Sequence, residues 1–251
     1  MAKILYLVPG VGMDEEEIKR RERIANTFLT NNKSEVTVEA VEEGPLSIES
    51  TIEEFMSVPC SLKKIAEVQD RYDAIIIGCL GDPGLAPARE LADVPIIGPF
   101  ESSLTLASML GEKFSIITVL DSIVPAIRRT LREYGLDDRC ASVRVVNCPV
   151  LELGKSKDKV VKTFLNEAKK AVEQDGASTL ILGCMSMAFL LVDEIVRSKL
   201  EAPVVNPAKA SVKFAEMWAS LGLKQSRRTY PRPDYRKLQR SVLPNITIGG
   251  K

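Results

Sequence analysis

The sequence predicts an α/β protein built from two similar doubly wound parallel-sheet domains, related by pseudo-twofold symmetry, with an active site in the cleft between them. Three observations predict this fold. Short β-branched and apolar runs alternate with longer amphipathic stretches, which is typical of parallel sheets covered by helices. The second half of the chain repeats the first at an offset of 105–110 residues. Each half also places a cysteine directly after an apolar run.

In the first half, strands and helices are expected to alternate. We expect strands at Ile4–Val8, Val36–Val41, Ala74–Gly78 and Pro95–Ile97. Helices are expected from Asp14 to about Leu29, from Ile48 to Arg71 with an interruption at Pro59, at Leu85–Leu91, and from about Glu101 to Gly111. Asp14 with Glu17 shows the N-cap and N3 pattern that opens a helix. The same alternation then resumes in the second half.

Five segments of the second half match the first half in order. The pairs are "KILYLV" with "KFSIIT", Val36–Val38 with Val143–Val145, "AIIIGC" with "TLILGC", "VPIIGP" with "APVVNP", and two helices rich in Ala and Met. Five matches in order argue for a duplicated α/β unit. The duplication places Cys79 and Cys184 at equivalent positions, just past the carboxyl ends of parallel strands. Open α/β sheets bind their ligands at these ends.

Composition excludes several function classes. The chain has 251 residues, with 34 Lys and Arg against 34 Asp and Glu, so no net positive charge favours nucleic-acid binding. Histidine is absent, which excludes Ser-His-Asp triads, Cys-His dyads and His-ligated metals. Five cysteines, an odd number without a CxxC pair, fit a reducing compartment. We expect a cytoplasmic protein that binds no nucleic acid, no membrane and no metal.

Cys79 and Cys184 are the candidate catalytic residues. A cysteine after three apolar residues is usually a core residue, but two at equivalent strand ends favour a shared role. Asp82 and Ser186 are each expected to cap a following helix, which would place both sulfurs near helix N-termini that favour thiolate. A thiolate facing a thiol can remove a proton from carbon and return one to the opposite face. Because Asp82 is acidic and Ser186 neutral, we expect Cys184 to be the more acidic thiol. The remaining cysteines are expected to be structural: Cys60, Cys140 and Cys148.

Other motifs carry weaker signals. Gly10-Val11-Gly12 lacks the third glycine of a dinucleotide loop and is better interpreted as a strand-to-helix turn. Glu53-Glu54 is expected to be solvated helix charge. "GDPG" at Gly81–Gly84 is a tight turn or a substrate clamp made of backbone amides. Residues 224–240 carry seven basic residues and one acid, and a solvated tail draped over a domain is favoured over a phosphate-binding arm.

At both cysteines the sequence resembles a known family. "IIIGCLGDPGLAPAREL" around Cys79 and "LILGCMSM" around Cys184 are similar to the hydantoin racemases of the Asp/Glu racemase superfamily. Further similar segments are "FSIIT", "GPLSIES" and "ASVKFAE", so the resemblance covers nearly the whole chain. It implies racemisation of 5-monosubstituted hydantoins, allantoin among them, without a cofactor. It also implies that the closing helices trade places, with residues 1–98 and 207–251 forming one domain and 99–206 the other.

The chain departs from the family pattern at several positions expected to line the pocket. Pro9 is followed by Gly10-Val11 instead of Asn and Ser or Thr, and Cys184 by Met185-Ser186-Met187 instead of Ala-Gly-Met. Asn206-Pro207 replaces an Asp-Gly pair, and Gly98-Pro99-Phe100 departs from the usual Gly-Ile or Gly-Thr segment. The resemblance to the family therefore predicts the class of reaction better than it predicts which substrate this chain uses.

The expected mechanism is a two-cysteine proton transfer through an enolate of a small cyclic ureide, with backbone amides holding the developing oxyanion. The residues expected to bind substrate are Pro9, Gly81, Asp82, Thr118, Ser122, Met185 and Ser186. A homo-oligomer is also expected. Two alternatives stay open: a racemase of the aspartate or glutamate type, or a related isomerase; and a non-catalytic small-molecule binding protein on the same fold.

Overall fold

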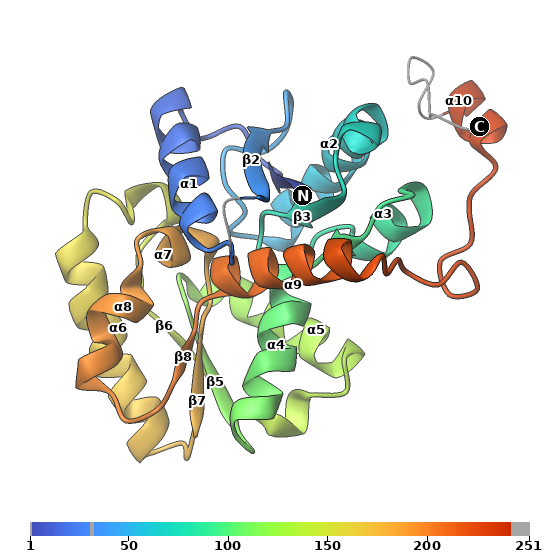
Figure 1. The fold of residues 1–251 in the computed structure, drawn as a ribbon. Coiled ribbons are helices and arrows are strands. Elements are labelled where there is room, and N and C mark those ends of the chain that lie inside the picture. Colours follow the sequence, from blue (N-terminus) through green and yellow to red (C-terminus); the bar gives the residue numbers. More distant parts are fainter. Residues whose placement is uncertain (1, 31–32, 242–251) are drawn as a thin grey trace.

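The computed structural model describes residues 2–30 and 33–241 and contains two parallel four-stranded sheets (Figure 1). The strand order is β2-β1-β3-β4 in the first sheet and β6-β5-β7-β8 in the second. All pairings are parallel. The two orders are identical when β1 is matched with β5, β2 with β6, and so on. The predicted duplicated α/β architecture is therefore confirmed.

The strands are short and the helices lie between them in sequence. The strands are β1 (Lys3–Val8), β2 (Glu35–Ala40), β3 (Ala74–Ile77), β4 (Ile96–Ile97), β5 (Phe114–Thr118), β6 (Cys140–Val145), β7 (Thr179–Leu182) and β8 (Val204–Val205). The α-helices are α1 (Glu15–Thr27), α2 (Thr51–Val68), α3 (Leu85–Leu91), α4 (Pro99–Leu110), α5 (Val124–Glu133), α6 (Lys157–Glu173), α7 (Met185–Phe189), α8 (Val192–Val196), α9 (Pro207–Leu221) and α10 (Tyr235–Ser241).

Strand β1 is buried on both faces, as its unbroken apolar run predicts. Ile4, Tyr6 and Val8 point into a core that continues into the second half of the chain. Leu5 and Leu7 point to the other face, into a smaller core shared with α2 and α3. Successive side chains of a strand alternate between faces, so one strand contributes to both cores.

Helices α4 and α9 each close the sheet of the other half. Helix α4 follows the first sheet in the chain but packs on β7 and β8, whereas α9 packs on β1, β3 and β4. The two helices also pack against each other. The division into 1–98 with 207–251, and 99–206, stays a prediction. Residues 1, 31–32 and 242–251 of the predicted first domain lie outside the described residues.

The prediction that Pro59 interrupts a helix is wrong. Helix α2 runs continuously through Pro59. Proline removes the hydrogen bond to the carbonyl four residues earlier, which belongs to Phe55. Phe55 is exposed, so water can reach that carbonyl. The helix begins with a capping box: the Ser50 hydroxyl accepts from the Glu53 amide, and the Glu53 carboxylate accepts from the Ser50 hydroxyl and the Glu49 amide.

The basic C-terminal segment lies on the first half of the molecule. The Arg227 guanidinium donates to the carbonyls of Arg89, Glu90 and Ala92, at the end of α3, where helix carbonyls have no helical partner. Arg227 and Arg232 both pair with Asp93. The favoured interpretation, a tail draped over a domain, is therefore confirmed for the described part of this segment.

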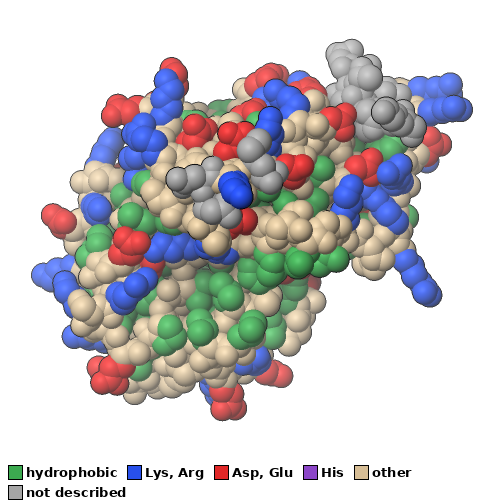
Figure 2. Space-filling model, in the orientation of Figure 1, with side chains coloured by type: hydrophobic (Ala, Val, Ile, Leu, Met, Phe, Trp, Pro, Cys, Tyr) green, Lys and Arg blue, Asp and Glu red, His purple; other side chains and the backbone are tan. Residues whose placement is uncertain are grey.

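Basic and acidic side chains are interspersed around the rim of the face drawn in Figure 2. Exposed apolar side chains occur at the ends of α4 and α9, including Met109 and Leu221. The expected homo-oligomer stays a prediction. Across residues 2–30 and 33–241, no helix has the length and apolar character needed to cross a membrane.

Candidate active site

A cavity lies between the two halves, at the carboxyl ends of the central strands. Its wall includes the residues that end or follow these strands: Val8 and Pro9, Gly78 and Cys79, Val119, and Gly183 and Cys184. The two predicted catalytic cysteines therefore line one cavity. All five cysteines are free thiols.

Matching backbone contacts position the two cysteines. The amide of Gly78 donates to the Leu7 carbonyl at 2.6 Å, and that of Gly183 to the Ile117 carbonyl at 2.7 Å. Glycine is needed at both sites. A Cβ at residue 78 would lie 2.5 Å from Tyr6 Cε1, and one at residue 183 would lie 2.6 Å from Thr118 Cα. The close approach turns the chain out of each sheet and places the next residue, the cysteine, on the cavity wall.

The Cys79 loop differs from the expected local cap. Gly84, not Asp82, is the N-cap of α3. Asp82 has a φ of 51°, and its carboxylate accepts from the amides of Phe100 and Glu101, each at 2.9 Å. Asp82 thus caps the N-terminus of α4, a helix much later in the chain. Gly98 leaves room for it, because a Cβ there would lie 2.3 Å from Asp82 Oδ2.

Burial dominates the electrostatics of this loop. Burial raises the pKa of Cys79 to about 12, although the Gly81 amide, which donates to the sulfur, opposes the shift. Cys184, Glu54 and Asp82 raise the pKa of Cys79 further. Burial likewise raises the pKa of Asp82 to about 8, against the two amides that bind its carboxylate.

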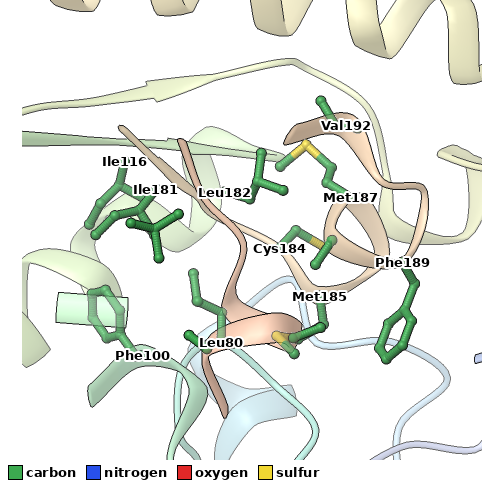
Figure 3. Close-up of a cluster of buried hydrophobic side chains, with 14 of the residues drawn as sticks. Leu80, Phe100, Ile116, Ile181, Leu182, Cys184, Met185, Met187, Phe189 and Val192 are labelled. Carbon is green, nitrogen blue, oxygen red and sulfur yellow. The ribbon is translucent and has the colours of Figure 1, made fainter. Parts of the chain in front are cut away.

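The Cys184 loop also differs from its prediction. Cys184 itself, not Ser186, is the N-cap of α7. The amides of Ser186 and Met187 donate to its sulfur. Burial raises the pKa of Cys184, while these amides, the Arg21 charge and the Ser186 hydroxyl lower it. Figure 3 shows Cys184 and Met185 among apolar side chains that include Leu80 and Phe100 from outside this loop.

The structure brings some predicted substrate-binding residues to the cavity and leaves others away from it. Pro9, Gly81, Met185 and Ser186 line it. The remaining three, Asp82, Thr118 and Ser122, are not among the lining residues, and all three are engaged with backbone groups. The Thr118 hydroxyl donates to the Gly183 carbonyl at 2.9 Å, and the Ser122 hydroxyl to the Glu49 carbonyl at 2.6 Å. The Asp82 amide donates to the Cys79 carbonyl at 3.2 Å, within a tight turn.

Two charged residues on the cavity wall were not among the predicted site residues: Arg21 and Glu54. Glu54 was expected to be solvated, but it is half-buried and burial raises its pKa. Helix spacing alone did not single out either residue. In the structure Arg21 lies four residues before the buried Ala25 of α1, and Glu54 lies three before the buried Ser57 of α2, so both fall on the inward faces of their helices.

Arg21 lies in a buried polar cluster beneath the cavity. Its Nη2 donates to Ser186 Oγ at 2.9 Å, and its Nε to Glu17 at 2.7 Å. Its Nη1 is buried and has no hydrogen-bond partner among the described residues. The guanidinium lies 5.0 Å from the centre of the Phe189 ring, which also packs edge-on against Tyr6. The Tyr6 hydroxyl is likewise buried without a partner among the described residues.

Most of the cavity wall is apolar. Its apolar side chains come from both halves and include Met13, Leu46, Ile123, Ile127, Leu151 and Met185. Among the described residues, no three His, Cys, Asp or Glu side chains are grouped as a metal site would require. The wall offers two thiols, backbone amides, the two charged side chains, and the hydroxyls of Ser47, Ser50, Thr130 and Ser186.

Comparisons with known proteins show which proteins this chain is similar to. A family model described as Asp/Glu/Hydantoin racemase matches residues 16–215. A hydantoin racemase of Pseudomonas sp. (strain NS671) is 38% identical over 76% of this chain and 77% of its own length. The crystal structure of an allantoin racemase from Pseudomonas fluorescens has a TM-score of 0.86 and 30% identity, over 92% of this chain and 97% of that one. An allantoin racemase from Klebsiella pneumoniae has a TM-score of 0.83 and 29% identity, over 93% of this chain and 94% of that one.

Proposed function

The chain belongs to the Asp/Glu/hydantoin racemase family, and from this premise we propose that it racemises 5-monosubstituted hydantoins without a cofactor, by proton transfer between Cys79 and Cys184. One observation carries the proposal. Two thiols follow equivalent strands of a duplicated fold and line one cavity. In the proposal, a planar carbanion binds between them, and each sulfur acts on one of its faces.

The proposed reaction balances within the cysteine pair. One cysteine, as thiolate, takes the hydrogen from C5 of the ring as a proton, and the electron pair moves into the adjacent carbonyl to form an enolate. The other cysteine, as thiol, donates its proton to the opposite face of C5. The configuration inverts, and the two sulfurs have exchanged protonation states. One thiolate and one thiol are needed, because two nearby thiolates would repel each other.

Backbone amides supply the donors in this proposal. The amide of Gly81 faces one sulfur, and those of Ser186 and Met187 face the other. Amides in these positions stabilise thiolate at the base, and neighbouring N–H groups near Gly81 and Met185 are candidates to hold the enolate oxygen. The Asp82 amide is a weaker candidate than the sequence suggested, because it already donates within the turn.

The apolar wall favours a hydantoin with an alkyl or arylmethyl group at C5 over one with a polar substituent. Burying an apolar substituent against these side chains contributes about 25 cal/mol for each Å² removed from water. A free amino acid would need a cation for its carboxylate and an anion for its ammonium group. Arg21 is the only cation among the described lining residues, and Ser186 and Glu17 already accept from it.

Optical rotation tests the proposal. Chelator-treated protein without PLP absorbance should racemise enantiopure 5-benzylhydantoin and 5-isobutylhydantoin, and thiol alkylation should stop the reaction. Allantoin, L-aspartate and L-glutamate serve as competing substrates. Racemisation of allantoin but of neither apolar hydantoin would overturn the proposal that the C5 substituent is an alkyl or arylmethyl group. Racemisation of the free amino acids alone would replace the function by an amino-acid racemase. Binding of hydantoin without racemisation or hydrogen exchange would make the protein a binding module.

A further inference from the structure

Two opposite charges lie on the cavity wall beside different cysteines. Among the described lining residues, Arg21 is the only cation and Glu54 the only carboxylate. They come from different helices, α1 and α2. The fold and the strand-end positions of the two thiols are symmetric, so this pair of charges breaks the symmetry of the site.

Arg21 belongs to the Cys184 side. Its Nη2 donates at 2.9 Å to the hydroxyl of Ser186, and the amide of Ser186 in turn donates to the Cys184 sulfur. Only 3% of Arg21 is exposed, so water screens its charge weakly. Glu17 offsets part of the charge, but Glu17 is also paired with Arg20. The buried Nη1 has no hydrogen-bond partner in the described part of the chain, so part of the positive charge has no hydrogen-bonded counterion there.

Glu54 belongs to the Cys79 side. Its Oε1 lies 3.6 Å from the position that a Cβ on Gly81 would take, and the Gly81 amide donates to the Cys79 sulfur. Glu54 is half-buried, and its negative charge disfavours a thiolate at Cys79. Arg129 and Glu133 act on Glu54 with opposite signs.

We propose that Arg21 and Glu54 are positioning residues that polarise the cysteine pair, so that Cys184 is the more acidic thiol and carries the thiolate of the active form, while Cys79 stays protonated. The inference rests on the proposed two-cysteine function and assigns the roles within it. Cys184 is the base that the free enzyme presents to substrate, and Cys79 is the acid. The enantiomer whose C5 hydrogen points to Cys184 is then the substrate of this active form.

Several titratable groups act on the two thiols. Those that act on Cys184 include Arg21, Tyr6, Cys79 and Cys148, and those that act on Cys79 include Glu54, Asp82, Cys184 and Tyr6. Asp82 adds to the effect of Glu54. Tyr6 is buried and its pKa is raised, so it is a neutral phenol beside both sulfurs.

The test measures how fast iodoacetamide alkylates each cysteine of the full-length protein between about pH 6 and pH 10, with the sites separated by mass spectrometry. Since only thiolate reacts, the profile reports each thiol without any substrate. Wild-type Cys184 should react faster than Cys79. R21M should slow Cys184 by about tenfold or more, because a nearby opposite charge shifts a pKa by about 1–3 units. R21K should restore the wild-type profile. E54Q should accelerate Cys79.

Two neighbours provide matched controls. R23M removes a positive charge from an exposed side chain on the same helix, which does not line the cavity. E53Q removes the adjacent negative charge and keeps a side chain that can complete the capping box. Both should leave the two profiles unchanged. If R21M does not fold, R21Q provides the same comparison with a donor to Ser186 retained.

Faster alkylation of wild-type Cys79, or R21M and E54Q profiles identical to wild type, would overturn the inference. Equal effects of R23M and R21M would show that only the net charge of the helix matters, and would also overturn the inference. The alkylation test can succeed or fail independently of the racemisation test of the proposed function. A protein that shows the predicted alkylation order but racemises no hydantoin would refute the substrate and leave the polarised pair standing.

Discussion

The two cysteine loops begin alike and then diverge. Each follows a central strand, each starts with a glycine whose amide binds the neighbouring strand, and each presents its cysteine to the same cavity. After the cysteine, one loop makes a tight turn through Asp82, whereas the other enters α7 directly with Cys184 as its N-cap. The duplicated scaffold thus sets where the sulfurs lie, and the diverged loops set their electrostatics.

The two cysteine loops also differ in how they are bonded to a later helix of the chain, α4 for the first loop and α9 for the second. Asp82 sits in the cysteine loop and reaches forward to cap α4. In the other half, Asn206 sits at the start of α9, caps it through the amides of Ala208 and Lys209, and donates back to the Ala188 carbonyl at the end of α7. Each half therefore links its cysteine loop to a helix N-terminus, but the linking residue lies in the loop in one half and at the start of the helix in the other. The same structural role does not require the same residue at the same position.

The largest expected effect comes from removing each sulfur in turn, which tests whether the two cysteines are equivalent in the reaction. C79S and C184S should each lower racemisation by on the order of 10²–10⁴-fold, because each loses its base or its acid. Each variant should still exchange the C5 hydrogen of one enantiomer in heavy water, and the two should prefer opposite enantiomers, as followed by NMR. C60S, C140S and C148S are the controls and should stay active. Full racemisation by either C79S or C184S would break the two-base assignment.

The pH profile sharpens the difference between the sulfurs. Burial raises the pKa of Cys184 above its ordinary value of 9.0 and that of Cys79 to about 12. A raised thiol pKa leaves little thiolate at neutral pH, so kcat/KM should rise about tenfold per unit from about pH 7 to about pH 9. No fall should occur until Cys79 loses its proton near the upper limit of the range. A bell-shaped profile centred near neutral pH would contradict this assignment of base and acid.

Alanine at the two strand-end glycines tests the shared scaffold. G78A places a Cβ 2.6 Å from the Leu7 carbonyl oxygen, and G183A places one 2.7 Å from that of Ile117. Backbone atoms cannot move aside, so each variant should lose about 1–3 kcal/mol of unfolding free energy, measured in urea. G154A is the control, since nothing lies within 4 Å of its new Cβ. A large loss for only one of the two glycines would show that the strand ends are not equivalent.

The smallest expected effect concerns the two caps. D82A and N206A should each lower the free energy of unfolding by about 0.5–2 kcal/mol through the lost helix cap. D82N should lose less, because asparagine tolerates a positive φ and keeps one acceptor oxygen. Thermal melting of the three variants checks the order. A D82N variant as unstable as D82A would indicate that α4 needs both carboxylate oxygens.

Local patterns in the sequence were sufficient for much of the fold. The alternation of apolar runs with amphipathic stretches predicted the parallel sheets, and the repeat predicted their common strand order. Asp14 caps α1 as predicted, since its carboxylate accepts from the Glu17 amide at 2.8 Å. These features depend on contacts within a few residues, or on a pattern that survives duplication. The repeat also placed Cys79 and Cys184 at equivalent strand ends, and both line one cavity, while their catalytic role stays a prediction.

Only the tertiary structure decided which charged and capping residues serve the site. Asp82 caps a helix that begins 17 residues later, and Arg21 reaches Ser186 across 165 residues of sequence. Residue spacing within a single helix or turn cannot predict either contact, because each contact depends on how separate elements pack. Glu54 was expected in water for the same reason: its helix face is buried by the Cys79 loop of the chain, not by its own neighbours. The sequence by itself determined the two thiols and the sheets that hold them, and the packing of helices α1, α2 and α4 around the strand ends decided the charges that face each thiol.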